Sequence, residues 1–179
     1  ASTGAVALFH AVGVTPEAPT VAEAFGGKAP EEMVEIRPDD VARALQRLSR
    51  VSDGASISAV CLGTPHFSRA EWDRLLSLLR GSAQAGKVPV YVNTGRETLG
   101  RLERDGVLND VAGFDLIPVA DTCTYVTSIL KKLDGAVMTN SGKWAHYAPG
   151  NIGVAVAFGS LEDCVASAVA GRVVRDASS

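Results

Sequence analysis

The chain has 179 residues, of which 46% are hydrophobic, and a formal net charge of −3 at pH 7. This length suffices for one sizeable buried core, so we expect a single globular domain over residues 1–179. Acidic and basic residues are interspersed without a Lys/Arg cluster, which argues against a nucleic-acid partner. No apolar run approaches the roughly 20 residues of a membrane-spanning helix, and no signal segment opens the chain. We therefore predict no membrane partner and a cytoplasmic location.

Seven apolar runs of strand length recur along the chain, with helical patterns between them. Their apolarity is continuous rather than alternating, which indicates strands that are covered on both faces. The sequence therefore predicts an α/β fold of three layers (αβα), with helices on both faces of a mostly parallel sheet of about five to seven strands. The runs are Ala5–Phe9, Met33–Ile36, Ile57–Leu62, Val88–Val92, Leu116–Val119, Ala136–Met138 and Val154–Phe158.

Capping residues mark the starts of the helices between these runs. Asp39 or Asp40 can cap a helix that begins after Pro38. Ser68 and Glu71 have the spacing of a capping box, in which each side chain satisfies a backbone N–H at the helix start. The same device is predicted at Thr94 with Glu97 and, more loosely, at Ser160 with Asp163.

The polar chemistry of the chain is concentrated directly after the apolar runs. In open α/β sheets, ligands bind beyond the carboxyl ends of the strands. The segments at those positions are "CLGTPHFS", "VNTG", "ADTCTY" and "TNSGKWAHYAPG". These four segments are therefore the expected site of function.

Two of the three cysteines are candidate metal ligands. Cys61 ends an apolar run, where a lone cysteine is more often core filler, whereas Cys123 lies in a polar turn that needs no filler. Two thiolates from neighbouring strand ends can hold a soft metal ion or an iron–sulfur cluster. Cys164 lies within an amphipathic helix and is interpreted as core. An odd number of widely spaced cysteines does not suit a disulfide framework, and no C-x2-C pair indicates structural zinc.

A histidine and a polar turn complete the candidate site. His66 follows Cys61 by five residues and can orient a carboxylate or carry a proton. Asn140 and Ser141 offer neutral hydrogen bonds, and Lys143 offers a cation for a carboxylate or a phosphate. If the turn opens a helix, its N–H groups add to the attraction for an anion. The alternative is an ordinary Asn-Ser-Gly turn with a solvated lysine.

Several common active-site motifs do not occur in the sequence. The phosphate-binding pattern G-x4-G-K-[ST] and the dinucleotide-binding pattern G-x-G-x-x-G are both missing. The nucleophile motif G-x-S-x-G is missing as well. The sequence thus gives no support to nucleotide binding of these types or to serine hydrolase chemistry.

Five strings occur in an order that resembles the aconitase X family, a branch of the aconitase superfamily. They are "GAVALFHAVGVTPEAP", "CLGTPHFS", "DTCTYV", "MTNSGKWAHYAPGNIG" and "GSLEDCV". The resemblance runs from about Gly4 to Val165 and corresponds to the C-terminal part of that family's large subunit or large catalytic domain. It implies an aconitase-like domain, and a chain that is a fragment of a longer catalytic polypeptide.

The resemblance implies a hydro-lyase that removes water from a hydroxylated carboxylate with the help of an iron–sulfur cluster, either 2Fe-2S or 4Fe-4S. Members of the family act on cis-3-hydroxy-L-proline in bacteria or on phosphomevalonate in archaea. A composition rich in Ala, Gly, Val and Arg, bacterial in character, favours hydroxyproline here. The alternative from another class is a non-enzymatic small-molecule-binding or assembly module.

The resemblance also assigns residues and partners. Cys61 and Cys123 match two cysteine-bearing motifs and are expected to be cluster ligands, while the third cysteine ligand lies outside this chain. The base that removes the α-proton is expected on a small swivelling domain or subunit. The expected partners are therefore that small subunit, the remaining N-terminal part of the large subunit and a small hydroxy acid. The expected substrate-binding residues are His66, Asn140, Ser141, Lys143 and His146.

Overall fold

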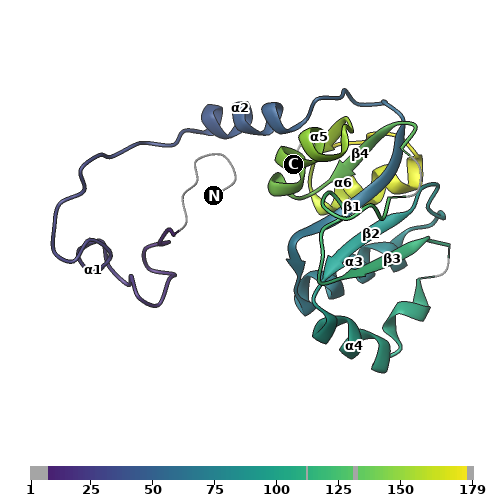
Figure 1. Cartoon of the computed structure of the whole chain (residues 1–179), viewed down its shortest axis with the longest axis horizontal. Coiled ribbons are helices and arrows are strands. Elements are labelled where there is room, and N and C mark those ends of the chain that lie inside the picture. The colour runs from purple at the N-terminus through teal and green to yellow at the C-terminus, as the bar shows by residue number, and fades with distance from the viewer. Residues whose placement is uncertain (1–7, 112, 131–132, 177–179) are drawn as a thin grey trace. The chain divides into compact units, whose positions relative to one another are not determined.

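The computed structural model describes residues 8–111, 113–130 and 133–176 (Figure 1). The chain divides into two compact units, Ala1–Arg43 and Ala44–Ser179. Helix α2 (Pro38–Leu48) begins in the first unit and ends in the second. Among the described helices, none is long and apolar enough to cross a membrane.

The first unit has little regular structure. Its short helix α1 (Val21–Ala24) begins after Thr20, whose hydroxyl accepts the N–H of Glu23 at 3.2 Å. The strand predicted at Met33–Ile36 is wrong: these residues are irregular, and the Met33 side chain is 86% exposed. The described part of the chain provides no neighbouring strand to pair with them. Of the run predicted at Ala5–Phe9, residues 5–7 lie outside the described residues, and the remaining two are irregular.

The second unit is built on a five-stranded sheet, which confirms the predicted α/β fold (Figure 1). The strand order is β3-β2-β1-β4-β5, and every neighbouring pair is parallel. Because all strands point the same way, their carboxyl ends lie at one edge of the sheet. The strands are β1 (Ile57–Phe67), β2 (Val90–Thr94), β3 (Leu116–Ala120), β4 (Ala136–Thr139) and β5 (Val156–Phe158).

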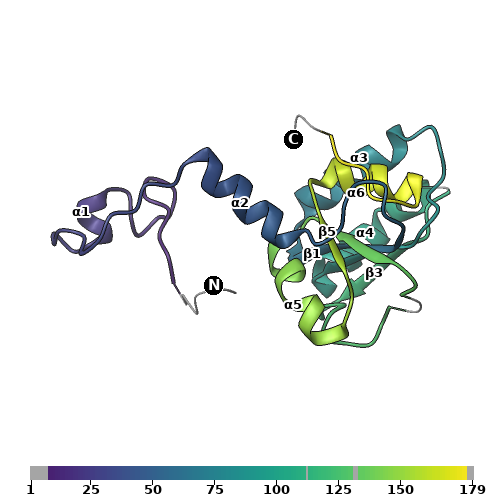
Figure 2. The same ribbon diagram turned by 90° about the horizontal axis from the view of Figure 1, so that it is seen from above.

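Helices cover both faces of this sheet, as the three-layer prediction required (Figure 2). On one face, Trp72 and Leu102 pack with apolar residues of the strands and of α6. On the other face, Trp144 and Ala148 of α5 pack against strand residues that include Cys61. The helices of the first face are α3 (Arg69–Gly81), α4 (Arg96–Arg104) and α6 (Leu161–Ala170); α5 (Gly142–Ile152) covers the second, and a 3-10 turn, η1 (Val107–Asp110), follows α4.

Two of the three predicted capping boxes form. Both reciprocal hydrogen bonds are present at Ser68 with Glu71 and at Ser160 with Asp163. The box predicted at Thr94 is wrong, because α4 begins after Gly95 without a side-chain cap from its own segment. The Thr94 hydroxyl instead donates to the carbonyl of Phe67 and accepts from the Trp72 indole, at 2.9 and 3.1 Å. Burial of Thr94 in the core thus overrides its local capping pattern.

Gly63 lets β1 pass close to β2. Its φ is +76°, in the left-handed region that favours glycine. A Cβ added to Gly63 would lie 2.7 Å from the backbone oxygen of Asn93 and 2.7 Å from the ring of Phe67. The close approach therefore requires a residue without a side chain.

Gly63→Ala should destabilise the chain. The left-handed φ costs roughly 1–2 kcal/mol for an L-residue, and relief of the overlap adds about 1–3 kcal/mol. Urea unfolding followed by circular dichroism should show a lower midpoint for Gly63→Ala. Gly81→Ala is the matched control, because that glycine ends α3 with open space around it. We expect it to be neutral or stabilising by up to about 1 kcal/mol; equal midpoints for both variants would contradict the prediction.

Candidate functional site

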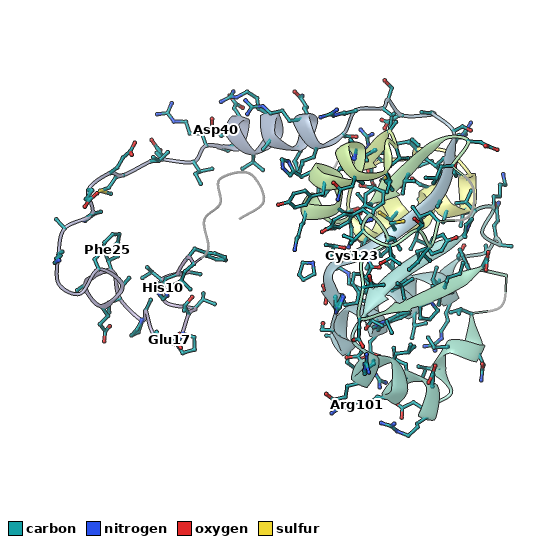
Figure 3. All side chains as sticks on the ribbon, in the orientation of Figure 1. His10, Glu17, Phe25, Asp40, Arg101 and Cys123 are labelled. Atoms are coloured by element: carbon teal, nitrogen blue, oxygen red, sulfur yellow. The ribbon has the colours of Figure 1, made fainter. Side chains whose placement is uncertain are left out.

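Thr64 joins the carboxyl ends of four strands. Its hydroxyl accepts from the Asn93 amide of β2 at 3.1 Å, and donates to the sulfur of Cys123, which follows β3, at 3.8 Å. Its carbonyl accepts a hydrogen bond from the hydroxyl of Ser141, which follows β4. Figure 3 labels Cys123 among the side chains of the second unit. Residues that are far apart in the sequence therefore meet at one residue of β1.

Ser141 begins α5 as its cap. The hydroxyl accepts the N–H of Trp144 at 3.1 Å while it donates to Thr64. The N–H of Ser141 donates to the hydroxyl of Thr139 at 3.1 Å. The Asn-Ser-Gly segment is thus the start of a helix rather than an isolated turn. Helix starts leave backbone N–H groups for an external acceptor and carry a partial positive charge.

A second set of hydrogen bonds connects Cys61 to the segment that carries Cys123. The Trp144 indole donates to the hydroxyl of Thr124 at 2.8 Å, and Thr124 is hydrogen-bonded to Cys61. Cys61 lies in the apolar cluster beneath α5, and Cys123 packs against that cluster. The two thiols therefore lie on the same side of the sheet.

The electrostatics of the two thiols follow from their surroundings. Burial raises the pKa of Cys61 to about 12, against the opposing effect of its hydrogen bond with Thr124. Cys123 is half-buried and is hydrogen-bonded to Tyr125. Burial and the neighbouring Cys123 raise the pKa of Tyr125. The ring of Tyr125 stacks on Tyr147, with 5.8 Å between the ring centroids.

Asp121 holds the turn that carries Cys123. The residue has a φ of +57°, and its carboxylate accepts the Arg96 N–H at 2.9 Å. The Arg96 guanidinium pairs with the same carboxylate. The Arg96 backbone N–H and then its guanidinium lower the pKa of Asp121. A carboxylate from the next strand end thereby supplies the cap that α4 does not find locally.

Three of the predicted substrate-binding residues are exposed. His66 lies near the end of β1, and Lys143 and His146 lie in the first two turns of α5. The ring of His146 meets the ring of Tyr147 edge-on at 4.9 Å between centroids. Their predicted role in binding substrate stays a prediction. The buried Ser141, by contrast, is engaged in the hydrogen bonds that fix α5.

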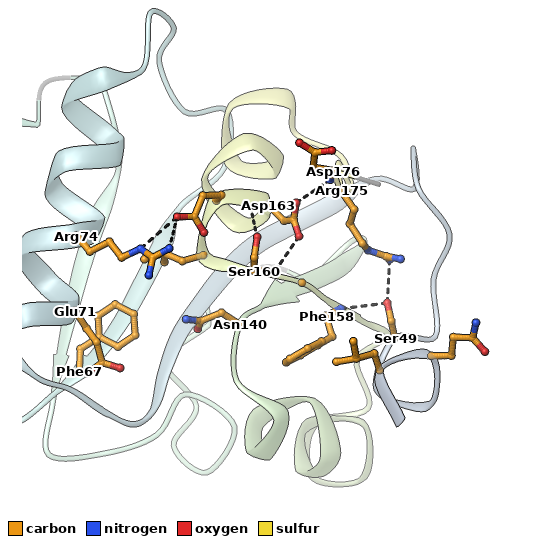
Figure 4. A pocket seen from close by; sticks show the side chains of 15 residues that line it. Ser49, Phe67, Glu71, Arg74, Asn140, Phe158, Ser160, Asp163, Arg175 and Asp176 are labelled. Carbon is orange, nitrogen blue, oxygen red and sulfur yellow. Dashed lines mark hydrogen bonds and ion pairs between the residues drawn. The ribbon is translucent and has the colours of Figure 1, made fainter. Parts of the chain in front are cut away.

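A cavity of about 750 Å³ lies beside this network, and Asn140 is the only predicted site residue that lines it (Figure 4). The Asn140 carbonyl oxygen is buried and has no hydrogen-bond partner among the described residues. At one side of the cavity Arg74 pairs with Glu162 at 2.7 Å. At another side the Asp163 carboxylate accepts the N–H of Asp176 at 2.9 Å. The cavity and the cysteine network are therefore neighbouring but different features.

The described residues offer two thiols to a metal centre, not a full ligand set. No three His, Cys, Asp or Glu side chains gather as a metal site in the part of the chain that the structure describes. Cys164 is buried in the apolar cluster on the opposite face of the sheet, and burial raises its pKa well above the usual value. Cys61 and Cys123 fit a cluster only if a further ligand comes from another part of the polypeptide. Their assignment as ligands stays a prediction.

The sequence reasoning missed three residues of this network, Thr64, Asn93 and Thr124. All three are almost fully buried, with exposed fractions of 3%, 0% and 1%. They lie within the segments "CLGTPHFS", "VNTG" and "ADTCTY" that follow the strands. Their position in these segments could have indicated a role in the site. Neutral threonine and asparagine side chains, however, form no sequence motif that would single them out.

Two family models match the chain. "Aconitase X second domain" matches residues 1–46, and "Aconitase X third domain" matches residues 57–170. The chain is also similar in fold to the crystal structure of Thermococcus kodakaraensis aconitase X (holo-form). The TM-score is 0.63 at 19% identity, over 79% of this chain and 36% of that one. This likeness concerns the fold alone.

Curated relatives carry two names. The chain is 37% identical to "Cis-3-hydroxy-L-proline dehydratase" of Pseudomonas aeruginosa, over 96% of this chain and 30% of the relative. It is 36% identical to the protein of the same name from Hypocrea jecorina, over 96% and 29%. It is 31% identical to "Phosphomevalonate dehydratase large subunit" of Methanosarcina mazei, over 96% and 40%. The chain thus spans about a third of the length of these relatives, and on the match of residues 57–170 to the family model it belongs to the aconitase X family.

Proposed function

We propose that this chain is part of a hydro-lyase that removes water from a hydroxylated carboxylate, with cis-3-hydroxy-L-proline as the substrate. The observation that carries the proposal is the hydrogen-bonded network that links Cys61 and Cys123 on one side of the sheet. The identity of 36–37% to two cis-3-hydroxy-L-proline dehydratases, over 96% of the chain, supports the choice of substrate.

We propose that the rest of a longer catalytic polypeptide completes the site. The relatives named above are about three times as long as the region they share with this chain. That additional length is the expected source of the third cysteine ligand. The words "large subunit" in the name of the Methanosarcina mazei relative support a small partner subunit or domain, on which we place the base that removes the α-proton.

Cys61 and Cys123 would hold an iron–sulfur cluster at the carboxyl edge. When bound, such a cluster supplies an iron that acts as a Lewis acid toward the hydroxyl and carboxylate of the substrate. Metal ligation requires thiolates, so Cys61 would have to lose the proton that burial favours. Its hydrogen bond with Thr124 would then stabilise the negative sulfur.

The start of α5 would hold the anionic end of the substrate. Lys143 presents an exposed ammonium in the first turn of α5, next to backbone N–H groups that face out of the helix. Asn140 adds a side-chain amide, whose NH2 group can donate to a carboxylate or phosphate oxygen. Ser141 would contribute by fixing this helix start rather than by its hydroxyl, which is already bonded to Thr64 and Trp144.

The full-length protein tests the proposal. Anaerobic purification should give a brown protein with visible absorbance that dehydrates cis-3-hydroxy-L-proline and not phosphomevalonate. Activity on phosphomevalonate alone would keep the reaction type and change the substrate. A colourless protein that binds small molecules without converting them would instead favour the non-enzymatic alternative and overturn the proposal.

Cys123→Ala should abolish colour and activity together in the full-length protein, because it removes a cluster ligand. Cys164→Ala is the control: it removes a thiol that is fully buried on the opposite face of the sheet. We expect Cys164→Ala to keep wild-type iron content and absorbance per chain. Both quantities are measured by iron analysis and visible spectroscopy. Equal loss in the two variants would contradict the assignment of Cys123.

Lys143→Ala should lower kcat/KM without changing the cluster content. A charge-assisted hydrogen bond contributes roughly 1.5–3 kcal/mol, which corresponds to about a 10- to 150-fold loss. Lys87→Ala is the matched control, because Lys87 is also exposed but precedes β2 at the amino edge of the sheet. Steady-state kinetics should show wild-type kcat/KM for Lys87→Ala. Intact catalysis in Lys143→Ala would make the α5 start a structural element only.

A further inference from the structure

We infer that Asn93 is a positioning residue for Cys123 and acts through the hydroxyl of Thr64. The inference rests on the proposed function, in which Cys123 is a cluster ligand. Three side chains from three different strand ends form a hydrogen-bond relay. Asn93 comes from β2, Thr64 from β1, and Cys123 follows β3.

The relay is closed off from solvent at its base. Asn93 is 0% exposed and Thr64 is 3% exposed, whereas Cys123 at the outer end is half-buried. The Asn93 amide nitrogen lies 3.1 Å from the Thr64 hydroxyl oxygen, and that oxygen lies 3.8 Å from the Cys123 sulfur. Hydrogen bonds in such surroundings are stronger than at a surface, because water does not compete for the groups.

The donor at each step sets the direction of the relay. An amide nitrogen can only donate, so the Thr64 oxygen accepts from Asn93. A threonine hydroxyl has one proton to give. With its oxygen held by Asn93, the hydroxyl directs that proton toward the sulfur of Cys123. Asn93 therefore fixes the Thr64 hydroxyl in the rotamer that donates to Cys123.

Asn93 lowers the stability of the fold at this position in β2. Its side-chain oxygen is buried and has no hydrogen-bond partner among the described residues. An unsatisfied buried acceptor costs stability, which an apolar residue in the same strand would avoid. The other residues that precede it in β2 are apolar or aromatic: Val90, Tyr91 and Val92. This cost in stability is explained if the amide nitrogen has a function. The nitrogen donates to the Thr64 hydroxyl, so we assign it the function of orienting that hydroxyl.

The Thr64 proton acts on the sulfur that would ligate metal. Hydrogen bonds to ligand sulfurs withdraw charge from them and contribute to the reduction potential and retention of a cluster. Tyr125 is a second hydrogen-bond partner of Cys123. Loss of such supporting partners typically lowers metal affinity by about 10- to 100-fold. We therefore expect the relay to affect how firmly Cys123 holds the cluster.

Variants of the full-length protein separate the effect of the Thr64 hydroxyl from the effect of side-chain volume. Thr64→Val keeps the volume but removes the proton, while Thr64→Ser keeps the hydroxyl. Asn93→Asp keeps the shape but presents an acceptor, so the Thr64 proton turns away from Cys123. Asn93→Ser, which is too short to reach Thr64, gives a second route should the aspartate variant fail to fold. Ser167→Ala is the control, because it removes another buried hydroxyl, one bonded to Val174. It belongs to α6, which covers the face of the sheet opposite to Cys61 and Cys123.

The readouts are iron and sulfide per chain, the rate of bleaching of visible absorbance in air, the midpoint potential of the cluster, and urea stability. We expect Thr64→Val and the Asn93 variants to bleach about 10- to 100-fold faster than wild type, with a shifted midpoint potential. Thr64→Ser and Ser167→Ala should bleach like wild type, although Ser167→Ala unfolds at lower urea. The double variant Thr64→Val/Asn93→Asp should bleach no faster than Thr64→Val, since both changes remove the same hydrogen bond from Thr64 to Cys123.

The outcomes distinguish the inference from the function on which it rests. A colourless wild-type protein overturns the proposed function and the inference with it. A coloured wild type whose folded Thr64→Val variant bleaches at the wild-type rate overturns the inference alone. If Thr64→Val bleaches faster but both Asn93 variants do not, Thr64 acts without Asn93 and the positioning role is wrong.

Discussion

The structure depends on the length of its central strand. β1 has 11 residues, whereas its neighbours β2 and β4 have five and four. It extends past β4 at the carboxyl edge, and its register against β2 shifts between Leu62 and Phe67. Gly63 allows this extension to pass within contact distance of Asn93. Thr64 then stands among three other strand ends and bonds to each of them. A shorter β1 would leave the segments that carry Cys123 and Ser141 without a common partner.

Most of the second unit could be predicted because its signals are local. Continuous apolar runs mark buried parallel strands, and the pairs Ser68 with Glu71 and Ser160 with Asp163 are short-range patterns that form as expected. Met33–Ile36 carries the same apolar signal but finds no strand partner among the described residues. Thr94 has the right spacing for a cap, yet the Trp72 indole captures its hydroxyl in the core. In both cases tertiary context decides what the local pattern cannot.

The candidate site was less predictable than the fold. Cys123 stands out because a thiol in a polar turn has distinctive chemistry. Thr64 and Asn93 do not stand out, because neutral hydrogen-bonding residues are common and the bond between them spans 29 residues. Asp121 caps α4 across 25 residues for the same reason. Side chains that act on one another across strand ends become visible only when the register of the sheet is known.

Burial divides the residues at the carboxyl edge into two groups with different physics. Thr64, Asn93 and Cys61 are at most 3% exposed, so their hydrogen bonds are fixed and removal of one partner leaves another unsatisfied. Lys143 and His146 are exposed, and water screens their charge and competes for their hydrogen bonds. Such groups attract an anion strongly only once water has been displaced from around them. The edge therefore combines a buried layer that orients sulfur with an outer layer that gains strength when another surface covers it. That requirement agrees with the proposal that the rest of a longer polypeptide closes the site.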